Sequence, residues 1–345
     1  SQSALADAVV INAGGLNATG MVSYGASAMG YGMGAVVNNG SVVSLGDAIA
    51  VGVYAASYGL DSLAYVSNTN SVYSHAGLSA GMSMAASANN TNTGDTVVLN
   101  SATGTINATG GILAIGVSAH ANDGDVTVTN AGAIHAQAYG SPGAVAIAVA
   151  MSGTAGTNTL NNLAGGVIQA YGANTYAYAV TGDDGVDVIN NAGTITGDVL
   201  TYAGDDKFNN LAGGIWNVAG TMQTDFGDDD DSLSNSGTIW ITNGSIGFGN
   251  GDDTATNNAN GLINLSNGLI HMDAGTNTFT NAGKINVLGH VGNTIDAGAA
   301  GTVFNNGLIE MNTGFTNEAL TVASTFGGTT GHLSIDVHQV GLTAD

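Results

Sequence analysis

The sequence predicts an all-β fold, a right-handed parallel β-helix (solenoid) of about twelve rungs with three short strands per rung. A short motif recurs between residues 183 and 309 at spacings of 20 to 24 residues, and a fixed period in this range indicates a solenoid. The residues between the turns alternate with period two and are rich in Val, Ile, Thr and Tyr, which predicts strands. Glycine and asparagine separate these runs and favour tight turns.

Each copy of the motif contains an isoleucine shortly after an asparagine. These anchor isoleucines are Ile195, Ile215, Ile239, Ile263, Ile285 and Ile309. We expect them to point inward on one face of the β-helix, because no single rung can bury its own apolar side. On a second face we expect the inward positions Val188, Phe208, Leu233, Phe279 and Phe304.

The asparagines of the motif predict a column along the axis. The expected members are Asn130, Asn161, Asn190, Asn210, Asn235, Asn258, Asn281 and Asn305. Stacked asparagines hydrogen-bond to one another and accept turn conformations. We therefore expect a structural column and favour it over a ligand site.

The N-terminal half carries a longer version of the repeat, of about 28 to 34 residues. A second alternating segment of small residues follows each copy there, for example residues 48–54 and 144–150. We expect the β-helix to span residues 1–320. Residues 321–345 depart from the repeat and predict a final strand pair or C-terminal cap, since solenoid ends need capping.

Composition excludes several functions. The chain has 345 residues, two basic residues and a net charge of −23. Nucleic acid binding needs Lys and Arg to displace phosphate counterions, so no nucleic acid partner is expected. The longest apolar run, residues 143–151, is too short to cross a bilayer, so we do not expect a transmembrane protein. Without cysteine, the chain has no disulfides and no thiolate metal site.

The glycine, paired aspartate, asparagine and isoleucine pattern over residues 182–309 resembles the passenger region of bacterial autotransporters (type V secretion). Residues 327–337 are similar to the segment that precedes the translocating barrel in that family. The resemblance implies a secreted or surface-displayed β-helix of a Gram-negative bacterium, located outside the cell or on its surface. It also implies that residues 321–345 begin the pre-barrel segment, as an alternative to a cap.

Aspartates recur along one predicted edge, one rung apart. The clearest groups are Asp183 with Asp184, Asp205 with Asp206, Asp228 to Asp231, and Asp252 with Asp253. Calcium prefers clustered carboxylate oxygens, so Asp184, Asp206, Asp229 and Asp253 are candidate ligands of a calcium ladder. The alternative is a solvated acidic turn that keeps the protein soluble.

Tyrosines and methionines gather near the N-terminus, including Tyr24, Tyr54, Met29 and Met84. Both residue types are enriched in interfaces, but we favour the alternative that they fill the wider N-terminal rungs. We expect a non-enzymatic, adhesive rod with a host or cell-surface ligand. A subunit that forms a homo-oligomer or filament, as in a surface layer or fibre, is the alternative. A polysaccharide-active enzyme is a third possibility.

Overall fold

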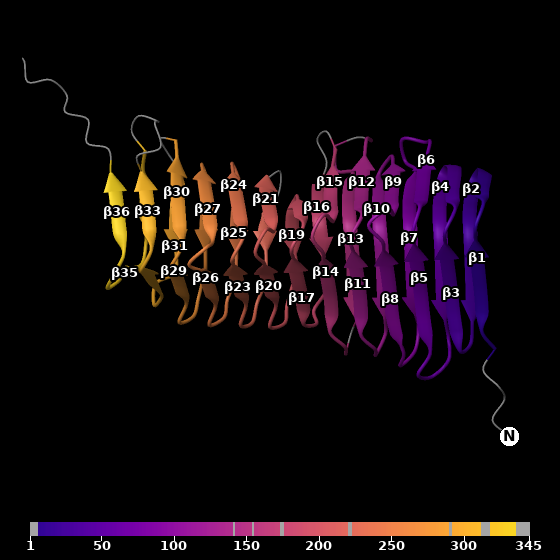
Figure 1. Cartoon of the computed structure of the whole chain (residues 1–345), viewed down its shortest axis with the longest axis horizontal. Helices are drawn as coiled ribbons and strands as arrows, with labels where there is room; N and C mark the ends of the chain where they lie inside the picture. The colour runs from indigo at the N-terminus through magenta and orange to yellow at the C-terminus, as the bar shows by residue number, and fades with distance from the viewer. Residues whose placement is uncertain are drawn as a thin grey trace, which may run out of the picture.

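The computed structural model describes residues 6–140, 142–153, 155–172, 176–219, 223–289, 292–311 and 318–335. Its regular elements are strands stacked side by side along one long axis (Figure 1). In this part of the chain, no helix is long and apolar enough to cross a membrane.

The first sheet, here called face 1, contributes one strand to each rung. Its thirteen strands, in spatial order, are β1 (Ala8–Asn12), β3 (Met33–Asn38), β5 (Leu63–Asn68), β8 (Asp95–Asn100), β11 (Val126–Asn130), β14 (Asn158–Asn162), β17 (Asp187–Asn191), β20 (Lys207–Asn210), β23 (Ser232–Asn235), β26 (Thr254–Asn257), β29 (Thr278–Asn281), β32 (Thr302–Asn305) and β35 (Thr325–Gly327).

The second sheet is bent into two further faces. In the first two rungs, β2 (Gly15–Gly30) and β4 (Ser41–Ser57) run through both of them. Face 2 continues with β6 (Ser71–Ala76), β9 (Thr105–Gly110), β12 (Ala133–Ala138), β15 (Val167–Tyr171), β18 (Thr194–Thr196), β21 (Ile215–Ala219), β24 (Thr238–Thr242), β27 (Leu262–Ser266), β30 (Lys284–Leu288), β33 (Leu308–Met311) and β36 (His332–Ile335).

Face 3 continues from the second halves of β2 and β4. Its strands are β7 (Met82–Asn90), β10 (Leu113–Ala121), β13 (Val145–Gly153), β16 (Tyr176–Thr181), β19 (Asp198–Leu200), β22 (Thr224–Asp225), β25 (Ser245–Gly247), β28 (Leu269–His271), β31 (Asn293–Asp296) and β34 (Leu320–Val322).

Each strand pairs in parallel with the equivalent strand of the next rung, for example β17 with β20 and β18 with β21. This confirms the parallel β-helix with three strands per rung and about twelve rungs. Thirteen strands on face 1 give twelve steps of about 4.8 Å, or a rod roughly 58 Å long. The right-handed winding stays a prediction, supported by the strong right-handed preference of parallel crossovers.

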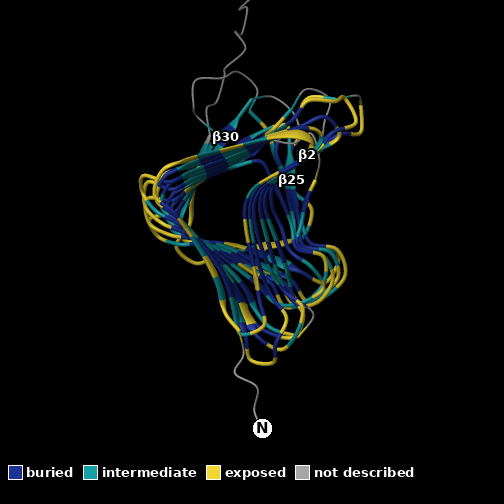
Figure 2. Cartoon of the chain, turned by 90° about the vertical axis from the view of Figure 1, so that its right-hand side faces the viewer, coloured by how far each residue is buried: buried dark blue, intermediate teal, exposed yellow. Residues whose placement is uncertain are grey.

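Two apolar columns line the interior, and only their last members, Leu333 and Phe326, are as much as 52 % exposed. Figure 2 shows buried residues in all the strand layers. The face 2 column runs Leu16, Val42, Val72, Ile106, Ile134, Ile168, Ile195, Trp216, Ile239, Ile263, Ile285, Ile309 and Leu333. The face 1 column runs Val10, Val36, Val66, Val98, Val128, Leu160, Ile189, Phe208, Leu233, Ala255, Phe279, Val303 and Phe326. Each fully buried large side chain contributes about 1.5 to 3 kcal/mol, so the columns hold the rungs together.

Three of the predicted inward positions were wrong. Val188 is half-buried and points outward while Ile189 is buried, and Phe304 is 40 % exposed while Val303 is buried. Ile215 is 38 % exposed, because Trp216 is the residue that aligns with Ile195 and Ile239. In each case the prediction was off by one residue, and a shift by one moves a side chain to the opposite face of a strand.

Aromatic side chains fill the core where the rungs become shorter. The rung between Asn191 and Asn210 spans 19 residues, against 29 for the rung before it. Phe208 stacks on Trp216 with ring centroids 4.1 Å apart. The Trp216 indole donates a hydrogen bond of 3.2 Å to the Gly197 carbonyl. The large aromatic rings therefore fill the core at the junction between the longer and the shorter rungs.

A continuous asparagine ladder runs along the end of face 1. Its members are Asn12, Asn38, Asn68, Asn100, Asn130, Asn162, Asn191, Asn210, Asn235, Asn257, Asn281 and Asn305, each at most 6 % exposed. Neighbouring side chains are joined by Nδ2 to Oδ1 hydrogen bonds of 2.7 to 2.9 Å. Because the amide both donates and accepts, every rung is tied to the next.

The predicted column was right at five positions and wrong at three, where Asn162, Asn191 and Asn257 replace Asn161, Asn190 and Asn258. All three errors lie in Asn-Asn doublets, where neighbouring residues point to opposite sides of the chain. Asn161, Asn190 and Asn209 instead form a short second ladder outside the core, with hydrogen bonds of 3.0 Å.

The C-terminal segment continues the solenoid as far as the structure describes it. β35 pairs with β32, and β36 pairs with β33. The Asn305 amide donates a hydrogen bond of 3.2 Å to the His332 carbonyl, as the ladder does elsewhere. Residues 336–345, the remainder of the predicted cap or pre-barrel segment, lie outside the described residues.

Candidate functional site

The turn from face 3 to face 1 brings the aspartates into two adjacent columns. The inner column contains Asp187, Asp206, Asp231 and Asp253, each at most 1 % exposed. The outer column contains the exposed Asp205, Asp230 and Asp252. In the pairs Asp205-Asp206, Asp230-Asp231 and Asp252-Asp253 the two side chains point to opposite sides of the chain, so one is buried and the other faces solvent.

The carboxyls of Asp206, Asp231 and Asp253 each accept a hydrogen bond from the backbone of the preceding rung. The Asp187 amide donates to Asp206 at 2.7 Å, the Asp206 amide to Asp231 at 2.8 Å, and the Asp231 amide to Asp253 at 2.9 Å. The series ends at Asn277, whose Oδ1 accepts from the Asp253 amide at 2.9 Å. The asparagine oxygen therefore accepts the same backbone hydrogen bond that the aspartate oxygens accept in the other rungs.

The second oxygens of Asp231 and Asp253 are buried and have no hydrogen-bond partner in the part of the chain that the structure describes. Burial raises the pKa of Asp187, Asp206 and Asp231 to about 8, and that of Asp253 to about 7. Removal from water disfavours the charged form of a carboxyl. The inner column is thus a row of neutral carboxylic acids in acidic solution that ionises only near neutral or alkaline pH.

The outer carboxylates accept hydrogen bonds from backbone amides of the following rung, in the opposite direction to the inner column. Asp205 accepts from the Asp230 amide at 3.2 Å, Asp230 from the Asp252 amide at 2.8 Å, and Asp252 from the Thr276 amide at 2.7 Å. The Asp230-Asp231 turn therefore receives one carboxyl contact from the rung before it, through Asp205, and one from the rung after it, through Asp253. Both columns stabilise the turns.

The four predicted calcium ligands do not form a single column. Asp206 and Asp253 belong to the buried inner column, whereas Asp184 and Asp229 lie on exposed turns. The Asp229 carboxylate accepts from the Gly204 amide at 3.2 Å. Within the described residues, no group of three or more His, Asp or Glu side chains is arranged to hold a metal ion. The calcium ladder stays a prediction.

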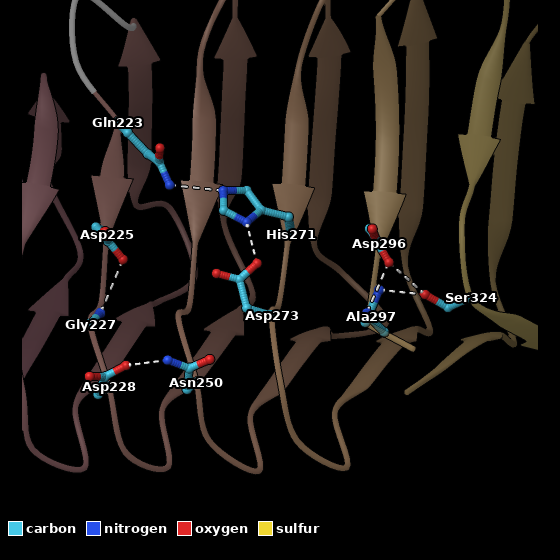
Figure 3. A network of polar contacts seen from close by, with 11 residues as sticks. Gln223, Asp225, Gly227, Asp228, Asn250, His271, Asp273, Asp296, Ala297 and Ser324 are labelled. Atoms are coloured by element: carbon cyan, nitrogen blue, oxygen red, sulfur yellow. Dashed lines mark hydrogen bonds and ion pairs between the residues drawn. The ribbon is translucent and has the colours of Figure 1, made fainter. Parts of the chain in front are cut away.

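A separate polar network lies on the C-terminal part of face 3 (Figure 3). The Gln223 amide nitrogen lies 2.9 Å from His271 Nε2, and His271 Nδ1 lies 3.5 Å from Asp273. Gly247 leaves room for this contact, since a Cβ there would meet the His271 ring at 2.9 Å. A Gln223 amide that donates to Nε2 requires the tautomer with the ring proton on Nδ1, toward Asp273. Each ring nitrogen therefore has a polar neighbour.

Comparisons with protein families, curated proteins and solved structures found no match for this chain. The function is therefore argued from the geometry of the faces and edges.

The N-terminal tyrosines and methionines separate onto different faces. Tyr24, Met29, Tyr54 and Met84 line one groove of about 440 Å³ on the outside of face 3, together with Ser27 and Val51. Tyr65 and Tyr73 lie on faces 1 and 2 and take no part in it. The sequence marked the residue types, but only the parallel stacking of β2, β4 and β7 brings four of them together.

Proposed function

We propose that this protein is a non-catalytic rod, secreted or displayed on the surface of a Gram-negative bacterium, that presents its side faces for adhesion. The observation that carries the proposal is the uninterrupted stack, in which two apolar columns and the asparagine ladder continue from rung to rung. A solenoid of this kind offers long lateral faces of constant spacing. The autotransporter-like motif pattern supports the surface location.

The use of the polar groups supports a non-catalytic role. The aspartates of the outer column accept backbone hydrogen bonds in repeating register, and the His271 ring is engaged on both sides. Catalysis requires convergent groups in a cleft that are free to contact a substrate. The repeated carboxyls instead serve the same structural purpose in each rung.

Adhesion can be tested with the purified chain coupled to beads. We expect coated beads to be retained on host cells or on bacterial surfaces above the level of beads coated with an unrelated protein of similar negative charge. Equal retention would overturn the adhesive role.

Self-assembly into a layer or fibre is the second candidate. Among the described strands, β1 and β2 pair on one side only, and such edges can template further strands. Electron microscopy separates the two candidates. Isolated rods about 58 Å long support the adhesive rod, whereas ordered filaments or sheets make the chain an assembly subunit.

A further inference from the structure

Face 3 of the longer, N-terminal rungs bends inward in the middle of its strands. In β4, β7, β10, β13 and β16 at least two consecutive residues are buried at this point, for example Gly52 with Val53 and Gly116 with Val117. A straight strand would bury only one of each pair. The bend lies close against face 2, because a Cβ on Gly52 would be 2.5 Å from the Val72 side chain. The outside of face 3 is therefore concave.

The outward side chains before the bend form an apolar wall. In register from rung to rung, they are Tyr24, Val51, Met84, Ile115, Ile147 and Tyr178. Tyr24 is 54 % exposed at the N-terminal end of this wall. Tyrosine rings and aliphatic side chains offer stacking and apolar contact to a ligand.

The outward side chains after the bend form a polar wall. Three residues further along each strand, and again in register, they are Ser27, Tyr54, Ser87, Ser118, Ala150 and Thr181. All of them except Ala150 carry a hydroxyl. The wall stays polar two residues beyond Ser118, where His120 Nδ1 lies 2.8 Å from the Ser152 hydroxyl.

The two walls enclose a groove that follows the rod axis. Its first three rungs form the 440 Å³ groove described above, which is lined by Tyr24, Val51 and Met84 from the apolar wall and by Ser27 and Tyr54 from the polar wall. The same two columns continue in register over three more rungs. Five steps of about 4.8 Å make the groove roughly 24 Å long.

Two hydroxyls of the polar wall are almost buried and remain unpaired. Ser87 is 5 % exposed and Thr181 is 8 % exposed. Among the described residues, neither hydroxyl has a hydrogen-bond partner. A buried polar group without a partner costs free energy, so a ligand that hydrogen-bonds to these hydroxyls is favoured.

The two walls together select the chemistry of the ligand. Neither column contains Asp, Glu, Lys or Arg, so the groove favours an uncharged ligand. A hydrocarbon chain would leave the hydroxyls unpaired, and an extended peptide would place backbone amides against the apolar wall. A sugar chain presents C–H groups and hydroxyls side by side along its length, so it satisfies both walls.

We infer that this groove binds a neutral oligosaccharide that lies along the rod axis. The C–H faces of the sugar rings pack on the apolar wall, and the sugar hydroxyls hydrogen-bond to Ser87, Ser118 and Thr181. The inference rests on the proposed adhesive function and names the class of ligand.

The test uses the full chain and an array of linear oligosaccharides of increasing length, in which neutral members stand beside sialylated and sulfated ones. The neutral members include animal and bacterial glycans, so the hits identify the kind of surface that supplies the ligand. The affinity for the best neutral hit is then measured by calorimetry at two salt concentrations.

The variants remove one property of each wall. Ser87→Ala with Ser118→Ala removes two hydroxyls from the polar wall, and Ala150 shows that this column accepts alanine. Met84→Gln makes the apolar wall polar at nearly constant side-chain length. The control is Ser67→Ala, which removes a half-buried outward hydroxyl from face 1.

We expect the neutral oligosaccharide to bind wild type and the Ser67→Ala variant equally, with little effect of salt because the groove carries no charged side chain. The double variant should bind about tenfold more weakly, equivalent to about 1.4 kcal/mol, and Met84→Gln should also bind more weakly. The absence of a neutral hit, binding of acidic glycans only, or an unchanged affinity of the double variant overturns the inference. So does sedimentation that shows a wild-type dimer dissociated by Met84→Gln, because the groove then holds a second copy.

The outcomes separate this inference from the adhesive function. Bead adhesion that survives in a double variant without oligosaccharide binding overturns the groove as the adhesive site and leaves the adhesive function intact. Oligosaccharide binding without bead retention overturns the adhesive function and leaves the groove intact.

Discussion

Replacing Asp231 with asparagine should stabilise the protein at alkaline pH and weaken the pH dependence of its unfolding. Asp231 Oδ1 accepts the Asp206 amide hydrogen bond, and its Oδ2 is buried without a partner among the described residues. Asparagine has the same shape and keeps the accepting oxygen. The chain already uses Asn277 in this way one rung beyond Asp253, so the substitution introduces a side chain that the fold tolerates there.

The magnitude follows from the pKa of the buried carboxyl. Burial raises the pKa of Asp231 from 3.8 to about 8. A carboxyl whose pKa is higher in the folded than in the unfolded state stabilises the folded state at every pH below its unfolded pKa. That contribution is lost as pH rises from about 4 through about 8. At about 1.4 kcal/mol per pH unit the loss is at most roughly 6 kcal/mol. Because the carboxyls of Asp206 and Asp253 titrate together with Asp231, the loss is shared among the three groups. We therefore expect the Asp231→Asn substitution alone to restore roughly 1 to 3 kcal/mol of the free energy of unfolding at alkaline pH, the usual cost of an unpaired buried polar group.

The assay is chemical unfolding followed by circular dichroism between pH 4 and pH 9. The control is Asp230→Asn, which removes a neighbouring carboxylate from the solvent-exposed outer column. Wild type should lose stability steadily as pH rises, and Asp231→Asn should lose less than Asp230→Asn. If the two variants show the same dependence, or if Asp231→Asn is the less stable at pH 9, the reasoning about the buried column is wrong.

Three further predictions test the core, the ladder and the metal. Asn235→Ala removes two ladder bonds and should lower the free energy of unfolding by about 2 to 4 kcal/mol, whereas Asn209→Ala, in the outer ladder, should cost less than about 1 kcal/mol. Trp216→Ala should cost about 3 to 5 kcal/mol through the cavity it leaves; Trp240→Ala, at a site 40 % exposed, should cost much less, and equal losses would contradict the assigned core. Calcium in the millimolar range should raise the unfolding temperature of wild type but not of Asp229→Asn, and an unchanged wild-type value would argue against the calcium ladder.

The sequence by itself determined the fold class, because a solenoid repeats its constraints. The recurring isoleucines and asparagines satisfy the same requirement in each rung, so a pattern visible in one dimension predicts parallel stacking in three. Five of the predicted ladder positions and five of the six anchor isoleucines lie where they were expected. The same repetition identified the acidic edge before its geometry was known.

Only the tertiary structure decided which side of each strand faces the core. In a doublet such as Asn190-Asn191 both residues fit the pattern, and the alignment with neighbouring rungs selects Asn191. The pairs Asp205-Asp206, Asp230-Asp231 and Asp252-Asp253 were divided in the same way into a buried and an exposed residue. The groove lined by Tyr24, Met29, Tyr54 and Met84 was also hidden in the sequence, since period-two alternation predicts a strand without saying which of its sides is inside. The parallel pairing of β2, β4 and β7, between residues about thirty positions apart, brings these side chains together.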